Sequence, residues 1–487
     1  MSPALKIAYV SSEIAPFAKT GGLGDVGAAL PSYLDRLGHD VRPFLPLYAS
    51  IDRRAHALHP VGFAQDISVR MGGRAYTFSL WTAPLADGGP AAYFVDCPEL
   101  YARPHIYTSD PDEPQRFALL CRAVLESCQR MGWAPDVVHC HDWHTALLPL
   151  LLRTAYSWDS LFHRTRTMLT IHNIGYQGVG PARWIHDLGL ADWTHLFDPE
   201  DLRFERVNLL RTGLVYADLV TTVSPTHARE IQTPEYGMGL DGLLRARNST
   251  LVGILNGVDY GVWSPERDAY LPQRYSADRL EGKIANKRHL LAEIGLPASN
   301  GAPVAGIVSR FVPQKGFDLC FPVLPELLRT TDLRLVAVGS GDVVYEGFFA
   351  RLEREFPGRA VYYRGYNDEL AHLVEAGADL FLMPSRYEPC GLNQMFSLRY
   401  GTIPIVRRTG GLADTVEPFD PTTGRGTGFV FDHFTPDALR WALRSALDTY
   451  RNRRAWMQLM RNAMTRDHSW TRRAAQYVEA YAWLAGR

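Results

Sequence analysis

Glu388 lies in a polar turn between a strand-type run and a helical segment. The apolar run is residues 379–383, and residues with helical spacing extend from Leu392 to Tyr400. The N-terminus of such a helix, at Gly391 and Leu392, presents unpaired backbone N–H groups that favour an anionic ligand. A carboxylate beside a phosphate would repel it, so we expect Glu388 to contact a neutral polyhydroxy group next to the phosphate. A nucleotide sugar carries both parts.

Two cations follow another predicted strand. Arg310 and Lys315 stand between the apolar run at residues 304–309 and the next helical segment. At the carboxyl end of a parallel strand, both would lie at the ligand-binding edge of the sheet. Arginine can hold a phosphate through two parallel hydrogen bonds, and lysine acts as a point charge. We interpret the pair as a diphosphate site; the alternative is an exposed ion pair.

A short glycine-rich segment occurs twice. Thr-Gly-Gly-Leu-Gly-Asp at residues 20–25 recurs as Thr-Gly-Gly-Leu-Ala-Asp at residues 409–414, each after a predicted strand and loop. Glycine allows the backbone to approach a ligand closely, and the repeat indicates two similar α/β halves. The ligand-binding residues expected in and beside these loops are Lys19, Gly21, Gly22, Thr409, Gly410 and Gly411. The alternative for Lys19 is a solvated surface lysine.

The first loop also matches the G-x-G-x-x-G pattern of dinucleotide-binding folds through Gly22, Gly24 and Gly27. That pattern needs its first glycine tight against the strand and an acidic residue near the end of the next strand. About eleven residues separate Val10, the end of the strand, from Gly22, and Asp40 stands before its strand. We therefore do not expect a nicotinamide cofactor.

Polar residues follow two more predicted strands. Asp142 comes after the strand at residues 136–140, while His172 and Asn173 come after the strand at residues 167–171. Residues at strand ends of an open α/β sheet normally line the ligand crevice. Imidazole and amide groups there can bond sugar hydroxyls without a charge. The alternative for His172 is a core histidine.

The segment around Asp142 also has the residue types of a metal site. His139, His141, Asp142 and His144 are close together in sequence, but no cysteine pair or H-E-x-x-H helix accompanies them. We therefore predict no metal ligands here and no cofactor.

Length and patterning predict an α/β protein with two domains. The 487 residues exceed what one hydrophobic core usually organises. We place the domains at residues 1–252 and 253–465, with Asn256 in the turn where the chain crosses between them. Residues 63–95 are expected to form hairpin-like strands that decorate the first sheet. Residues 101–115 are expected to form a polar loop, either mobile or an ordered surface connection.

Charge balance and cysteine spacing indicate which partners and which compartment to expect. Lys plus Arg number 51 against 52 Asp plus Glu, so electrostatics favours neither nucleic acid nor an anionic membrane. The six cysteines are scattered without a C-x-x-C pair, which suits reduced core thiols. Because the first core strand begins near Leu5 and no run is long enough to span a membrane, we expect a cytoplasmic protein.

Two long motifs carry a family resemblance. S-R-Y-E-P-C-G-L-x-Q at residues 385–394 is followed by R-Y-G-T-x-P-I-V-R-R-T-G-G-L-A-D-T-V at residues 399–416, and S-R-x-x-x-Q-K-G stands at residues 309–316. Together they resemble the bacterial-type glycogen synthases and plant starch synthases, which use ADP-glucose. The resemblance covers nearly the whole chain.

The resemblance implies a GT-B glycosyltransferase fold with two Rossmann-like domains facing an interdomain cleft. A final helix, residues 466–487, would return to the first domain. The implied reaction is the transfer of glucose from ADP-glucose to the non-reducing end of an α-1,4-glucan such as glycogen, with retention, loss of ADP and no metal.

The resemblance also implies roles for the residues singled out above. Arg310 and Lys315, with N–H groups near Gly391 and Leu392, would stabilise the leaving diphosphate. Glu388 and His172 would hold the glucose. The expected contacts to the acceptor or the sugar are Asp25, Tyr107, Asp142, Asn173 and Asn256.

Two alternatives remain open at the level of sequence. One is another GT-B hexosyltransferase, with a UDP-glucose donor or a different acceptor, because no residue distinguishes ADP from UDP. The other is a catalytically silent glucan-binding protein, against which the presence of Lys19, Arg310, Lys315 and Glu388 argues.

Overall fold

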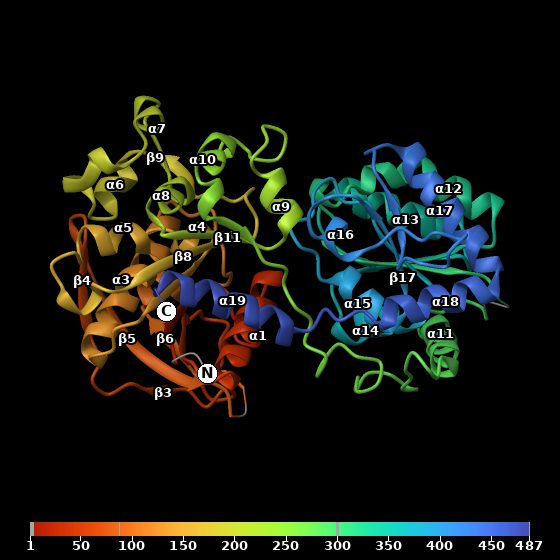
Figure 1. Ribbon diagram of the computed structural model, residues 1–487, viewed down its shortest axis with the longest axis horizontal. Coiled ribbons are helices and arrows are strands. Elements are labelled where there is room, and N and C mark those ends of the chain that lie inside the picture. The colour runs from red at the N-terminus through yellow and green to blue at the C-terminus, as the bar shows by residue number, and fades with distance from the viewer. Residues whose placement is uncertain (1–3, 87, 299–300, 487) are drawn as a thin grey trace. The chain divides into compact units, whose positions relative to one another are not determined.

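The computed structural model describes residues 4–86, 88–298 and 301–486. The chain divides into two compact units (Figure 1). Unit 1 comprises the chain up to Val223, residues Ala228–Asn256 and the chain from Trp470 onward, and unit 2 comprises Ser224–His227 and Gly257–Ser469. The main boundary therefore lies at residues 256–257, where the sequence had suggested 252–253.

Unit 1 is built on one large sheet, ordered β12-β11-β8-β7-β1-β2-β6-β5-β3, with β4 paired to β5. Its members are β1 (Lys6–Val10), β2 (Asp40–Pro46), β3 (His59–Pro60), β4 (Ile67–Met71), β5 (Arg74–Pro84), β6 (Ala91–Asp96), β7 (Val137–His141), β8 (Arg166–Ile171), β11 (Leu219–Thr222) and β12 (Leu251–Gly253). The pairings from β12 to β6 are parallel. In such a sheet the carboxyl ends of the strands share one edge, the usual place for a ligand.

The hairpin-like strands predicted at residues 63–95 are confirmed, and one further pairing joins them to the central sheet. β5 pairs antiparallel with both β4 and β6, as hairpins do, but β6 also pairs parallel with β2. This region therefore extends the central sheet. Alternating residues alone indicate hairpin strands and cannot show which further strand completes the pairing.

The helices of unit 1 connect and cover these strands. They are α1 (Gly22–Arg36), α2 (Pro98–Tyr101), α3 (Glu113–Met131), α4 (Asp142–Thr145), α5 (Leu148–Arg153), α6 (Arg183–Asp187), α7 (Pro199–Arg203), α8 (Leu209–Tyr216), α10 (Asp241–Ala246) and α19 (Trp470–Leu484), while α9 (Pro225–Glu230) begins in unit 2. A small sheet pairs β9 (Val179–Pro181) with β10 (Arg206–Asn208).

The last helix, α19, belongs to unit 1 although unit 2 precedes it in the chain. It lies against α1 (Figure 1) and buries Trp470, Tyr477 and Tyr481. The Tyr481 hydroxyl is 2.7 Å from His139 Nδ1 in β7. The returning helix is thus part of the first hydrophobic core.

Unit 2 contains a six-stranded parallel sheet ordered β15-β14-β13-β16-β17-β18. Its strands are β13 (Val304–Val308), β14 (Arg334–Gly339), β15 (Ala360–Arg364), β16 (Leu380–Met383), β17 (Ile403–Arg407) and β18 (Phe429–Phe431). Its helices are α11 (Glu281–Glu293), α12 (Cys320–Thr330), α13 (Val343–Glu355), α14 (Asp368–Gly377), α15 (Asn393–Tyr400), α16 (Gly410–Thr415), α17 (Pro436–Arg451) and α18 (Arg453–Met464). The strands predicted at residues 304–309, 379–383 and 403–406 are confirmed as β13, β16 and β17, within a residue or two.

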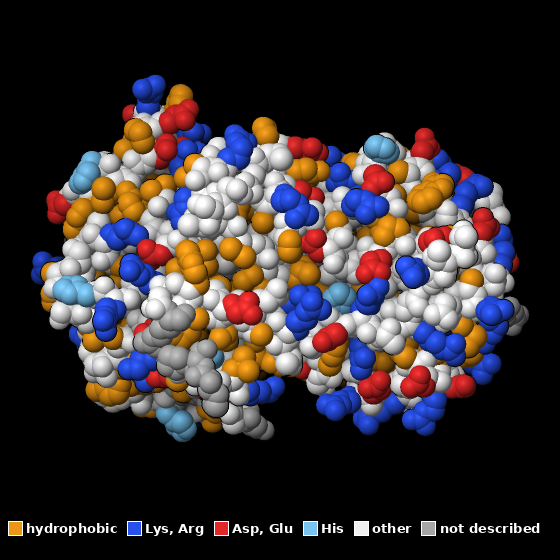
Figure 2. Space-filling view, viewed as in Figure 1, with side chains coloured by type: hydrophobic (Ala, Val, Ile, Leu, Met, Phe, Trp, Pro, Cys, Tyr) orange, Lys and Arg blue, Asp and Glu red, His pale blue; other side chains and the backbone are white. Residues whose placement is uncertain are grey.

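The mixed surface charges and the free, buried cysteines agree with what the composition predicts. Figure 2 shows cationic and anionic side chains intermixed on the visible face. All six cysteines are free and buried. Among the residues that the structure describes, no helix is long and apolar enough to cross a membrane.

Candidate active site

In unit 2, three loops at the carboxyl edge of the sheet pack backbone against backbone. They follow β13, β16 and β17. The Arg386 N–H donates to Gln314 O at 2.9 Å, and the Gly411 N–H donates to Glu388 O at 3.1 Å. At Gly410, where φ is +43°, a side chain would overlap the Glu388 carbonyl, so this close approach requires glycine.

The Lys315 ammonium and the Glu388 carboxylate form an ion pair within this framework. Lys315 Nζ lies 2.7 Å from Glu388 Oε2, and the Ser385 hydroxyl donates to the same oxygen at 3.0 Å. Glu388 is buried, with 5% of the residue exposed. A buried carboxylate needs such partners, so Lys315 both orients Glu388 and brings a cation to the same point.

Arg310 is placed differently. It is exposed just after β13, and within residues 4–86, 88–298 and 301–486 its side chain forms no hydrogen bond or ion pair. A guanidinium without an internal partner at this edge is available to an anionic ligand.

The N-terminus of α15 completes this edge. Gly391, with φ +72°, and Leu392 are half-buried, and Leu392 is the N-cap of the helix. The Asn393 side chain donates to Val308 O at 2.8 Å, which ties the helix start to β13. The predicted stop at Gly401 is confirmed as a left-handed C-cap with φ +66°.

The two glycine-rich copies differ in their surroundings. In the second copy, Thr409 is fully buried at the N-cap of α16, and the Gly411 N–H is already bonded to backbone. In the first copy, Gly21 is the N-cap of α1, with φ −163° and open space where a side chain would stand. The sequence repeat therefore marks two helix starts with different contacts.

Their two aspartates differ as well. Asp25 accepts from Lys19 Nζ at 2.6 Å, in a pair whose side chains are 40% (Lys19) and 34% (Asp25) exposed. Asp414 instead accepts from the Ser224 and Thr226 hydroxyls, each at 2.6 Å, and so anchors the start of α9. Within the first loop, Gly22 and Lys19 are both exposed.

Glu13 organises the first loop, a role that the sequence analysis missed. Its buried carboxylate accepts from the Thr20 N–H at 2.6 Å and hydroxyl at 2.7 Å, and from the Gly21 N–H at 3.2 Å. It also accepts from the Tyr107 hydroxyl at 2.6 Å. One carboxylate thus joins the glycine loop to the 101–115 segment. The available signal was an acidic residue between a core strand and a glycine loop.

The 101–115 segment is an ordered connection rather than a free loop. The Arg103 guanidinium pairs with Asp110 at 2.7 Å and also with Asp112. The Tyr107 ring stacks on His144 with centroids 4.8 Å apart, and its hydroxyl lies 2.9 Å from Ser12 Oγ.

His172, Asp142 and Asn173 come together after β7 and β8, as the sequence predicted. Asp142 has φ +54° and accepts from the backbone N–H groups of His172 at 2.7 Å and Asn173 at 3.3 Å. Burial raises the pKa of Asp142 to about 7 and lowers the pKa of His172 to about 3. His172 Nε2 lies 2.8 Å from His141 Nδ1. A neutral imidazole at this position can bond a sugar hydroxyl.

The other histidines of this segment have separate partners. His139 bonds Thr170 at 2.6 Å and Tyr481, whereas His144 stacks against Tyr107. Burial holds the pKa of His139 and that of His141 well below the ordinary value. No group of three His, Cys, Asp or Glu side chains in the described parts of the chain is arranged to hold a metal ion.

Two further residues follow strands of these sheets. Asn256 is buried beyond β12, and its Oδ1 has no hydrogen-bond partner among the described residues. Tyr366, beyond β15, is 63% exposed, and its hydroxyl donates to Asp368 at 2.7 Å. Sequence reasoning did not single out Tyr366, although it marked the strand that precedes it.

The predicted residues thus form two groups on two sheets. The group in unit 2 is Arg310, Lys315, Glu388, Gly391, Leu392, Thr409, Gly410 and Gly411, and the group in unit 1 is Lys19, Gly21, Gly22, Asp25, Tyr107, Asp142, His172, Asn173 and Asn256. Apart from Tyr107, which lies between α2 and α3, these residues lie in loops and helix starts that follow parallel strands.

Family models and solved structures match this architecture. A model described as "Starch synthase catalytic domain" matches residues 6–246, and one described as "Glycosyl transferases group 1" matches residues 295–462. The catalytic domain of starch synthase IV from Arabidopsis thaliana, solved with ADP and acarbose, is 34% identical over 100% of both chains, with a TM-score of 0.92. A sucrose-phosphate synthase from Thermosynechococcus elongatus, at 18% identity and a TM-score of 0.61, shares the fold.

The fold and these matches define a glycosyltransferase of the GT-B class. Curated relatives identify the family within this class. A glycogen synthase from Koribacter versatilis is 47% identical over 98% of this chain and 98% of its own length. One from Anaeromyxobacter dehalogenans is 47% identical over 99% of this chain and 100% of its own length. One from Thermotoga maritima is 42% identical over 98% of both chains. The chain belongs to the family of glycogen and starch synthases.

Proposed function

We propose that the protein is a glycogen synthase that moves glucose from ADP-glucose to the non-reducing end of an α-1,4-glucan, releasing ADP and retaining the anomeric configuration. The observation that carries this proposal is the Lys315–Glu388 ion pair in the loops at the carboxyl edge of the unit 2 sheet, where Arg310 follows β13 and Glu388 precedes α15. The related starch synthase was solved with ADP and acarbose, which supports a nucleoside diphosphate and a glucan as the two ligand classes.

The diphosphate is proposed to bind at Arg310, Lys315 and the helix start at Gly391 and Leu392. Negative charge grows on the diphosphate as its bond to glucose breaks, and fixed positive groups stabilise that charge. Lys19, at the exposed first glycine loop, adds a further cation. The buried Thr409, Gly410 and Gly411 hold the Glu388 turn in place.

The glucose is proposed to bind Glu388, His172 and Asn173, with Asp142 fixing the last two through their N–H groups. In the transfer, the bond from C1 of glucose to the β-phosphate oxygen breaks, and C1 forms a bond to the acceptor hydroxyl oxygen. The acceptor proton passes to the departing phosphate. Tyr107, Asp25 and Asn256 are proposed contacts of the acceptor or sugar.

The reaction is proposed to need no metal or other cofactor, because side-chain cations and a helix terminus can supply the positive charge. Activity should survive prolonged EDTA treatment. Activity that is lost and restored only by a divalent metal would contradict this.

The protein is proposed to be cytoplasmic. Its free buried cysteines support a reducing setting.

The test is to supply ADP-glucose or UDP-glucose with glycogen and to measure the released nucleotide and the lengthened glucan. We expect turnover with ADP-glucose to exceed that with UDP-glucose. A preference for UDP-glucose, or for another acceptor, would make the protein a different GT-B hexosyltransferase. Glycogen binding without turnover of either donor would make it a silent glucan-binding protein.

A further inference from the structure

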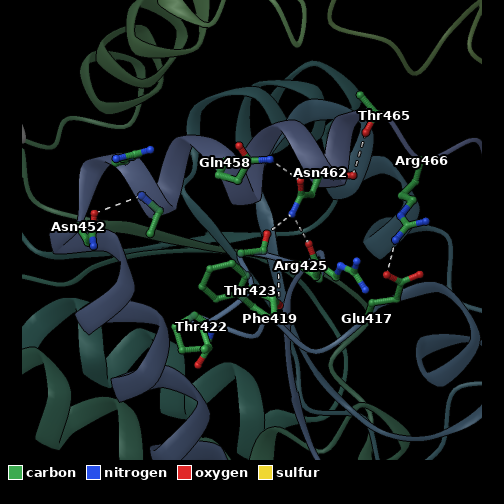
Figure 3. Close-up of a pocket in the computed structure, with 15 residues that line it drawn as sticks. Glu417, Phe419, Thr422, Thr423, Arg425, Asn452, Gln458, Asn462, Thr465 and Arg466 are labelled. Atoms are coloured by element: carbon green, nitrogen blue, oxygen red, sulfur yellow. Dashed lines mark hydrogen bonds and ion pairs between the residues drawn. The ribbon is translucent and has the colours of Figure 1, made fainter.

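Unit 2 has a cavity whose lining contains none of the residues assigned to the transfer reaction. It lies between α18 and the segment at residues 417–426, and its volume is about 830 Å³ (Figure 3). Its lining residues are Glu417, Phe419, Pro421, Thr422, Thr423, Gly424, Arg425, Gly426, Asn452, Arg454, Ala455, Gln458, Asn462, Thr465 and Arg466.

Hydrogen bonds fix the walls of this cavity. The Asn462 amide donates to Gly424 O at 2.8 Å and to Gly426 O at 3.0 Å, which joins α18 to the loop (Figure 3). Gln458 donates to Asn462 Oδ1 at 2.8 Å. Gly426 has φ +105°, and a side chain there would overlap Pro418 O. A cavity with fixed walls loses little conformational entropy when it binds a ligand.

The cavity is electropositive. Three arginines, Arg425, Arg454 and Arg466, face one acidic side chain among its lining residues, Glu417. Arg466 pairs with Glu417 at one end (Figure 3). Arg425 and Arg454 are exposed, and across the part of the chain that the structure describes their side chains have no hydrogen-bond or ion-pair partner. Two guanidinium groups are therefore available to an anion.

We propose that this cavity binds a phosphorylated monosaccharide. Arginine matches phosphate oxygens with paired N–H donors, while the exposed Gln458, Thr423 and Thr465 suit sugar hydroxyls. The volume falls within the range of small-molecule sites. A neutral glucan fits less well, because Phe419 is the only aromatic side chain among the described residues that line the cavity, and it is only half-exposed.

The position of Arg466 connects the cavity to the segment that leads toward α19. The Tyr260 hydroxyl donates to Arg466 O at 3.3 Å and accepts from the His468 N–H at 2.9 Å. Val258 N–H donates to His468 O at 2.7 Å. Arg466, which lines the cavity through its side chain, is thus joined through its backbone carbonyl to the place where the segments at Val258 and His468 pair with each other.

The test measures binding of glucose 6-phosphate by titration calorimetry, with excess ADP present to occupy the proposed donor site. The double variant Arg425→Ala/Arg454→Ala should bind at least about tenfold more weakly, because each guanidinium supplies charged hydrogen bonds. The control Arg453→Ala/Arg461→Ala removes two exposed arginines of α18 that do not line the cavity. It should bind within about twofold of the wild type.

Three comparison ligands complete the test. Glucose should give no binding that depends on Arg425 and Arg454, and inorganic phosphate should bind more weakly than glucose 6-phosphate. The proposal would be overturned if glucose 6-phosphate does not bind, or if it binds the double variant as tightly as the wild type. Inorganic phosphate that binds as tightly would reduce the cavity to a simple anion site. Maltoheptaose binding lost in the double variant would instead identify a glucan surface.

Discussion

Glu388 and Lys315 are 73 residues apart in sequence, yet their charged atoms lie 2.7 Å apart in the structure. The pairing gives the two cations of the proposed diphosphate site different properties. Lys315 is bound to a buried carboxylate, whereas Arg310 is exposed and its side chain has no partner among the described residues. Substitutions at the two positions should therefore have different effects on turnover and on thermal stability.

Arg310→Ala should lower kcat roughly a hundredfold while leaving glycogen binding and thermal stability unchanged, because the guanidinium acts on charge that develops during transfer. Lys315→Ala should lower kcat and also the melting temperature, since it leaves the Glu388 carboxylate buried without its cation. Steady-state kinetics, a glycogen pull-down and thermal unfolding separate these effects.

The matched control is Arg351→Ala, an exposed arginine of α13 that pairs only weakly with Glu355. It should leave all three measurements unchanged. Unchanged turnover in Arg310→Ala would assign that residue to the surface instead.

Glu388 also decides between two mechanisms. A double displacement requires a nucleophile on the face of the sugar opposite the diphosphate. Glu388 lies beside Lys315, in the turn before α15, on the side where we place the diphosphate. We therefore expect no covalent glucosyl-enzyme, with departure and attack on the same face.

The measurement is intact mass after acid quench of enzyme incubated with ADP-glucose and no acceptor. The mass should be that of the unmodified chain, and Glu388→Gln should act slowly while still forming α-linkages. A glucosyl adduct mapped to Glu388 would make that residue the nucleophile.

At the scale of elements, the two glycine-rich copies show how one sequence pattern serves different contacts. The first copy begins α1 and is held by the Glu13 carboxylate, while the second begins α16 and packs against the backbone of the Glu388 turn. The pattern predicts a helix start in both places. It does not specify what packs against the loop, because the partner comes from another part of the chain.

This difference predicts opposite outcomes for one substitution. Gly410→Ala should destabilise unit 2 by at least about 2 kcal/mol, because it combines positive φ with overlap at Glu388 O. Gly21→Ala should leave the melting temperature unchanged, since its φ of −163° suits any residue and no atom lies within 4 Å of the new Cβ. Thermal unfolding of the two variants checks this, and equal melting temperatures would contradict it.

At the scale of the whole molecule, the chain leaves unit 1 and returns to it with α19. This helix buries Trp470, Tyr477 and Tyr481 in the core of unit 1. In the chain it follows residues 257–469, which belong to unit 2. The stability of the first unit therefore depends on the last residues of the chain.

Truncation after Ser469 should expose amides of α1 and β7 to hydrogen exchange while those of β13 and β14 stay protected, because α19 contributes only to the core of unit 1. Segment-resolved hydrogen exchange measures this. Tyr481→Phe is the milder control, since it removes only the bond to His139. Equal loss of protection in both units would show that they unfold together.

Several elements could be predicted from local sequence pattern alone. Apolar runs located β13, β16 and β17, and Gly401 marked the end of α15. The predicted positions of Arg310, Lys315, Glu388 and His172 after strands are also confirmed, and parallel strands present their carboxyl ends at one edge of a sheet.

Contacts between groups far apart in sequence became visible in the folded structure. It paired Lys315 with Glu388, assigned Glu13 to the first glycine loop, and placed β6 in the central sheet. It also showed the cavity between α18 and the 417–426 segment, whose arginines come from separate stretches of chain. Local periodicity reports how each segment faces a core, whereas side-chain partners depend on the packing of residues far apart in sequence.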